Sequence, residues 1–176
     1  GDPNPAEGID KFRERKRKRF ATQTEMPEIA AAIDGVPNIY IRAAIWLYLL
    51  TGVRKSELLQ AKRADVDFTR AMLRLPETKS GDEQRAALNA PAIAIIQSLP
   101  ELEDNPYLLP STKRKGRHLV NIDKRWGEVR KAAGVEDLRL HDLRRTVGSW
   151  LSQGGVDLNR IKEALRHQNI ATTLTY

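Results

Sequence analysis

The hydrophobic and polar positions of the chain follow two periods, helical at both ends and strand-like in the middle. Apolar residues recur at helical spacing in MPEIAAAID (26–34), which follows the capping-box pair Thr22 and Glu25. The next stretch, PNIYIRAAIWLYLLTG (37–52), is apolar on nearly every face. It predicts a buried central helix that begins at Pro37 and stops at Gly52.

The middle of the chain changes to a period of two. A short helical pattern at 54–62 is followed by alternation in DVDFTRAMLRLP (65–76) and EQRAALN (83–89), with the turn TKSGDE (78–83) before the last strand. Helical patterns then return, each with Asp, Asn or Pro near its start or Gly near its end, at 90–99, 121–135, 141–155 and 157–167. The predicted fold class is α+β, mostly α-helical with one small three-stranded antiparallel sheet.

The first 20 residues differ in composition from the rest. They hold two prolines and two glycines, and seven of the nine residues from 11 to 19 are Lys or Arg. Such a run is either a solvated tail or an arm that lies along phosphates, and both descriptions fit here. We therefore expect a basic linker or arm at 1–20 and a single domain at 21–176, whose length suits one hydrophobic core.

The net charge points to a polyanionic partner. The formal charge is +7 and the isoelectric point is near 9.8, and clustered cations gain affinity for a phosphate backbone by releasing its counterions. Nucleic acid is the first candidate, although charge alone does not separate DNA from RNA or from an acidic membrane surface. Aromatic residues, at 6%, are too sparse to predict a base-stacking platform.

Other chemistry is narrowed by what the sequence lacks. It contains no cysteine, which excludes disulfides and thiolate metal sites, and its three histidines have no close spacing that would favour a metal. The longest apolar run, AAIWLYLL (43–50), is far short of the roughly 20 residues that cross a bilayer, and no signal-peptide pattern opens the sequence. We expect a cytoplasmic protein with no membrane partner.

Two pairs of polar side chains have a spacing that places both members on one helix face. Arg54 and Glu57 are three residues apart, which places them on one helix face, where a surface ion pair is the more common outcome. His141 and Arg144 share this spacing near a helix start, where unpaired backbone N–H groups favour an anion. A half-buried structural histidine is an equally good interpretation of His141.

Taken together, these pieces resemble a known family. The ordered set TGVRKSEL (51–58), TKS (78–80), HDLRRT (141–146) and LRHQNIATTLTY (165–176) is similar to the tyrosine recombinase family, of the phage-integrase type, from Thr22 to Tyr176. Each motif is weak alone, but the combination is specific. The resemblance implies the catalytic domain of a site-specific DNA recombinase that requires neither metal nor other cofactor.

The resemblance also implies roles for individual residues. The implied catalytic set comprises Arg54, Lys79, His141, Arg144, His167 and Tyr176, with Glu57 as the supporting acid. Tyr176 is the expected nucleophile, which forms a 3′-phosphotyrosyl intermediate, and Lys79 is the expected acid for the leaving 5′-oxygen. Cations are expected on the DNA backbone at Lys16, Arg17, Lys18, Arg19, Arg145 and Arg166. Arg166 stands where the family usually has glycine.

The family's wider properties set further expectations. The partner is double-stranded DNA with attachment-type sites, and the full-length protein self-associates to a tetramer on it. Such a protein is bacterial or prophage-encoded and associates with the nucleoid. The sequence looks like an excised catalytic domain, without the core-binding domain and without the segment that follows the tyrosine in relatives.

Three alternatives stay open. The first is a DNA-binding relative that keeps the fold and has lost catalysis, which the competent residue type at every catalytic position disfavours. The second is a mechanistic relative, such as a type IB topoisomerase or a telomere resolvase, which matches the motif arrangement less well. The third is a basic helical adaptor for other proteins, which leaves the motif set to chance.

Overall fold

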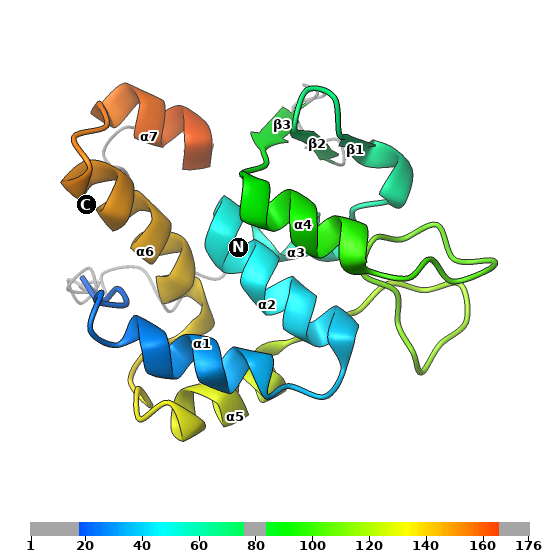
Figure 1. The fold of residues 1–176 in the computed structure, drawn as a ribbon, viewed down its shortest axis with the longest axis horizontal. Coiled ribbons are helices and arrows are strands. Elements are labelled where there is room, and N and C mark those ends of the chain that lie inside the picture. The colour runs from blue at the N-terminus through cyan, green and yellow to red at the C-terminus, as the bar shows by residue number, and fades with distance from the viewer. Residues whose placement is uncertain (1–17, 76–83, 166–176) are drawn as a thin grey trace, which may run out of the picture.

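The helices are arranged around one central helix. The computed structural model describes residues 18–75 and 84–165. Helix α2 (Ile39–Thr51) lies in the middle of the fold and buries most of its side chains. It contacts four helices: α1 (Met26–Asp34), α3 (Lys55–Gln60), α4 (Ala90–Ser98) and α6 (Leu140–Gln153). The predicted buried central helix is confirmed (Figure 1).

The two ends of α2 have different causes. The Asn38 side chain accepts hydrogen bonds from the backbone N–H groups of Tyr40 and Ile41, both at 3.0 Å, so the helix begins at Ile39 and the predicted start at Pro37 is wrong. An Asn N-cap satisfies first-turn N–H groups, which have no acceptor within the helix. Gly52 ends the helix with a φ of 61°, as predicted.

The sheet lies at one side of the helical body (Figure 1). Its strands β1 (Val66–Asp67), β2 (Met72–Leu75) and β3 (Gln84–Ala87) pair in the order β1-β2-β3, both pairs antiparallel. A 3-10 helix, η1 (Arg63–Asp65), precedes β1. Leu73 and Leu75 point into the core while Arg74 between them is exposed, as strand alternation requires.

The remaining helices complete the core. Helix α5 (Asp123–Ala132) packs against α1, and α7 (Leu158–Leu165) packs against α6. The predicted helices are all present. Helix α1 has the predicted bounds, α6 begins one residue earlier than predicted, and the others begin or end one to three residues inside the predicted ranges, as is common at helix ends. The predicted end of the last helix, at 167, lies outside the described residues. The mostly helical α+β class with its three-stranded sheet is confirmed. None of the helices among residues 18–75 and 84–165 is both long and apolar enough to cross a bilayer.

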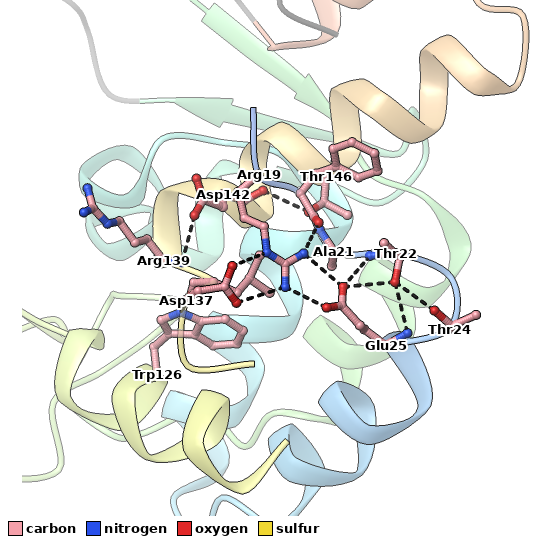
Figure 2. Close-up of polar contacts among 12 residues, drawn as sticks. Arg19, Ala21, Thr22, Thr24, Glu25, Trp126, Asp137, Arg139, Asp142 and Thr146 are labelled. Atoms are coloured by element: carbon pink, nitrogen blue, oxygen red, sulfur yellow. Dashed lines mark hydrogen bonds and ion pairs between the residues drawn. The ribbon is translucent and has the colours of Figure 1, made fainter. Parts of the chain in front are cut away.

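The amino end of the described chain is fastened to α6 (Figure 2). The Ala21 N–H donates to the buried Thr146 hydroxyl at 2.9 Å, and that hydroxyl donates to the Asp142 carbonyl at 2.9 Å. The Trp150 indole N–H donates to the Ala21 carbonyl at 3.2 Å. Both backbone groups of Ala21 are therefore satisfied by α6, which fixes the position of Ala21 against this helix.

Arg19 adds an ionic contact at the same place (Figure 2). Its guanidinium lies 2.7 Å from Glu25 and 2.7 Å from Asp137, which precedes α6. The hydrogen bond from Arg19 lowers the pKa of Glu25. The capping-box partners are also bonded reciprocally, with the Thr22 N–H at 2.8 Å from the Glu25 carboxylate and the Glu25 N–H at 3.3 Å from the Thr22 hydroxyl.

Thr146→Val tests this attachment. The valine has nearly the same shape but no hydroxyl, so it leaves the buried Ala21 N–H without its partner. We expect the free energy of unfolding to fall by about 1–3 kcal/mol, measured by urea denaturation. Thr69→Val, at an exposed turn position, is the control and should change stability little. Equal stability of the Thr146→Val and wild-type proteins would contradict the assignment.

Candidate active site

An open pocket of about 360 Å³ lies where α2, α3, α5 and α6 meet. Its lining combines basic, polar and apolar side chains from these helices and their caps: Tyr48, Arg54, Lys55, Ser56, Asp123, Leu140, His141 and Arg144. Three of the predicted site residues, Arg54, His141 and Arg144, are thus brought to one cavity from two distant parts of the sequence. The fold converts two separate motifs into a single surface.

Arg54 is held by a buried carboxylate. It is the N-cap residue of α3, just outside the helix, and its guanidinium donates to Glu57 at 2.8 Å. Glu57 also accepts the Arg54 backbone N–H at 3.3 Å, and its side chain is only 11% exposed. The pair is therefore no ordinary surface ion pair, which was the alternative that the spacing alone favoured. Glu57 orients Arg54 at the pocket by accepting hydrogen bonds from both the backbone N–H and the guanidinium of Arg54.

Arg144 is almost completely enclosed, at 3% exposure. Its guanidinium donates to the backbone carbonyls of Gly52, at the end of α2, and Leu165, at the end of α7. A buried charge is tolerated only when its hydrogen-bonding groups are satisfied, and these carbonyls serve that need. Because both carbonyls are neutral, the positive charge of Arg144 is not cancelled by them at the pocket.

His141 lies in the first turn of α6 and reaches the surface. The protein around it removes part of its hydration, which lowers its pKa below the ordinary value of 6.5, and the positive charges of Arg145 and Arg144 lower it further. Asp142 opposes this shift more weakly. At neutral pH the imidazole is therefore uncharged, with one nitrogen able to donate a hydrogen bond and the other able to accept one.

Asp142 is a site-building residue that sequence reasoning missed. It is 1% exposed, accepts the Arg139 backbone N–H at 2.8 Å, and accepts a hydrogen bond from Arg145 at 3.2 Å. We expected unpaired N–H groups at this helix start. For Arg139 this is wrong, because its N–H donates to the Asp142 carboxylate. The signal in the sequence was an acid three residues after a helix start, as in a capping box, but with arginine at the N-cap position.

Two charged residues in the lining of the pocket were also missed. Lys55, the residue after Arg54, lies 2.7 Å from the carboxylate of Asp123, the first residue of α5. Nothing in the local sequence pairs positions so far apart. Only the packing of the helices brings these two side chains to the pocket.

The other predicted residues are distributed as follows. Several lie outside the described residues: Lys16, Arg17, Lys79, Arg166, His167 and Tyr176. Of the remaining predicted backbone contacts, Lys18 is exposed, while Arg19 is engaged with Glu25 and Asp137 and Arg145 with Asp142. The DNA-contact role of these cations stays a prediction.

The arrangement suits an oxyanion. Two oriented guanidinium groups supply fixed positive charge and multiple donors, and the neutral imidazole adds a donor of its own. Arginine binds two oxygens of a phosphate with its planar fork and keeps its charge at any physiological pH. Within residues 18–75 and 84–165, no group of three or more His, Asp or Glu side chains is placed to bind a metal ion.

Comparison with known sequences reveals consistent similarity. A model of the phage integrase family matches residues 19–176. The tyrosine recombinase XerA of Pyrococcus furiosus is 27% identical over 182 residues, covering 97% of this chain and 63% of that protein. The tyrosine recombinase XerC of Mycobacterium sp. strain KMS is 33% identical over 150 residues, covering 77% of this chain and 48% of that protein. The chain thus spans less than two thirds of these relatives.

Solved structures share the fold. The crystal structure of XerA recombinase superposes with a TM-score of 0.79 at 23% identity, covering 95% of this chain and 61% of that one. XerH site-specific recombinase, solved in a pre-cleavage complex with its difH substrate, gives a TM-score of 0.74 at 23% identity, covering 89% and 49%. The chain therefore has the same fold as the matching parts of these recombinases.

The pKa of His141 provides a test of the pocket's electrostatics. Arg145→Gln removes a neighbouring positive charge and frees Asp142 from its ion pair, and both changes favour the imidazolium. We expect the pKa of His141 to rise toward its ordinary value, followed by NMR titration of the ring resonances with His141→Gln for assignment. Arg125→Gln, on α5 and paired with Glu128, is the matched control.

The same shift has a consequence for stability. The unfolded chain binds the His141 proton more readily than the folded one, so this residue destabilises the fold as pH drops below 6.5. Arg145→Gln should reduce that part of the loss. An unchanged pKa in Arg145→Gln would show that Arg145 does not act on His141.

Proposed function

The chain belongs to the phage integrase family, and from that premise we propose that it is the catalytic domain of a site-specific recombinase that cuts and rejoins DNA strands. The observation that carries the proposal is the convergence of Arg54, His141 and Arg144 on one pocket. These groups can hold the non-bridging oxygens of a phosphodiester and stabilise the charge that develops on them during attack.

The proposed reaction is a phosphoryl transfer between oxygens. The Tyr176 hydroxyl oxygen attacks the phosphorus, the bond from phosphorus to the 5′-oxygen breaks, and the DNA is left joined to the protein through a 3′-phosphotyrosyl bond. Lys79 gives a proton to the leaving 5′-oxygen. A phenol is mostly protonated at neutral pH, so the cations of the pocket and a nearby acceptor must favour its loss of a proton.

The second half of the reaction reverses the first. A free 5′-hydroxyl attacks the phosphotyrosyl phosphorus, which restores a phosphodiester and releases Tyr176. One ester replaces another of similar energy in each half, so neither ATP nor another energy source is consumed. His141, neutral in the free protein, can donate a hydrogen bond to the phosphate and exchange a proton with the tyrosine.

The proposed partner is double-stranded DNA carrying attachment-type sites. The basic charge of the chain supports phosphate contacts, and XerH, which shares the fold, is described in complex with its difH substrate. In the longer protein we propose a tetramer on DNA, acting in the cytoplasm of a bacterium on nucleoid or prophage DNA. The arm at 1–20 would lie along the backbone.

A suicide-substrate assay tests the reaction. The protein is incubated with nicked duplexes that carry candidate attachment sequences, so that the cleaved strand diffuses away and the covalent intermediate accumulates. We expect a protein–DNA adduct on a denaturing gel, and its loss in Tyr176→Phe, which keeps the ring but lacks the attacking oxygen. Arg54→Gln should reduce adduct formation by at least about 100-fold, because it removes a donor to the transition-state charge.

The controls separate catalysis from binding. A gel-shift assay with the same duplexes shows whether Tyr176→Phe still binds DNA, as it should if only the nucleophile is missing. Specific binding without any adduct from the wild-type protein would favour the alternative of an inactive DNA-binding relative. An adduct that persists in Tyr176→Phe would assign the nucleophile to another residue.

A further inference from the structure

The ion pair between Lys55 and Asp123 lies at the same pocket as Arg54, His141 and Arg144. It joins the first residue of α3 to the first residue of α5, at 2.7 Å. Both side chains are accessible, with 37% of Lys55 and 48% of Asp123 exposed. Among the residues that line this pocket in the described part of the chain, Asp123 is the one carboxylate.

The geometry points to Lys55 as a further ligand of the phosphate, with Asp123 as the counter-ion that the phosphate replaces. This inference rests on the proposed function, because it names how the same pocket receives a DNA phosphodiester. Lys55 follows Arg54 directly in the chain and lines the same cavity, so a phosphate bound by Arg54 lies within the region that the lysine's long, flexible stem can sweep.

The exchange is favourable on electrostatic grounds. An ion pair between exposed side chains contributes little to stability, so Lys55 loses little when it leaves Asp123. A phosphate that entered with the pair unchanged would meet the Asp123 carboxylate as a like charge. When Lys55 turns to the phosphate, it gains a charge-assisted hydrogen bond while Asp123 remains accessible to water.

The other acidic residues near the pocket are held differently. Glu57 and Asp142 are buried and bonded to backbone N–H groups as well as to arginines. Separating either carboxylate from these partners would cost free energy, because hydrogen-bonding groups inside the protein would be left unpaired. Asp123 is exposed enough for water to solvate it when Lys55 moves away. Its carboxylate can therefore pair with Lys55 until a phosphate takes its place.

Phosphate titration of the 176-residue chain tests the inference. Inorganic phosphate is added at constant ionic strength and pH 7, and the His141 ring resonances report its binding inside the pocket. We expect Lys55→Gln to weaken the apparent affinity about three- to tenfold, and Lys55→Arg to retain it. Asp123→Asn should strengthen it about two- to fivefold, because the competing charge is gone.

A second ion pair on α5 offers matched controls. Arg125 and Glu128 lie 2.6 Å apart with 47% and 49% of their side chains exposed, and neither lines the pocket. Arg125→Gln and Glu128→Gln therefore change the net charge by the same amounts as Lys55→Gln and Asp123→Asn. We expect both controls to alter phosphate affinity less than about 1.5-fold, since exposed charges outside the site are screened. Thermal melting checks that every variant is folded.

The outcomes are distinct. If Lys55→Gln behaves as Arg125→Gln does, or Asp123→Asn as Glu128→Gln does, the effect is one of net charge and the inference is overturned while the proposed function stands. If phosphate leaves the His141 resonances of the wild-type protein unchanged, both the inference and the phosphate-binding basis of the proposed function fail. The expected pattern, in which Lys55→Arg retains the phosphate affinity, supports a ligand role for Lys55.

Discussion

A guanidinium inside a protein must find acceptors there, and the position of Arg144 depends on this requirement. Its acceptors are the carbonyls of Gly52 and Leu165, so α6 is joined to the end of α2 and the end of α7 by one side chain. Gly52 is specifically suited to this junction. Its φ of 61° favours glycine, and a Cβ there would lie 2.6 Å from a methyl carbon of Leu165. Three helices are thus joined around one buried charge, which lies in the lining of the pocket.

The charges around the pocket are held in two ways. Arg54 and Arg145 are each bonded to a carboxylate that is buried and also caps a helix start, Glu57 for the first and Asp142 for the second. Such carboxylates serve backbone and side chain together, which makes the orientation costly to change. Lys55 and Asp123 form a partly exposed ion pair, so water can solvate each side chain if the pair separates. The pocket thus combines an arginine held by a buried carboxylate with an ion pair whose members are both partly exposed.

The amino end of the described chain is bonded to the same helix, α6. Ala21 is bonded through both backbone groups to Thr146 and Trp150, and Arg19 joins α1 to the segment before α6. Arg144 and Thr146 are two residues apart on α6, one toward the pocket and the other toward the amino end of the described chain. Arg19 and Ala21 are therefore held against the helix that carries His141 and Arg144 and against the segment before it.

Much of this protein follows from its sequence. Periodicity predicts the buried α2, the three-stranded sheet and the order of the helices, because apolar residues recur at the spacing that places them on the buried face of a helix or strand. Spacing singled out the pairs Arg54–Glu57 and His141–Arg144, and the resemblance to the tyrosine recombinase family assigned Arg54, His141 and Arg144 to one site. The start of α2 was missed because the Asn38 side chain, which accepts hydrogen bonds from the first-turn N–H groups of Tyr40 and Ile41, prevailed over the preference for Pro37 at the first turn. Tertiary structure alone decided four other features. They are the burial of Glu57, the hydrogen bond of Asp142 at the start of α6, the lowered pKa of His141 and the ion pair between Lys55 and Asp123. Each depends on which groups lie nearby in space and how much water they exclude, and neither quantity is set by local sequence.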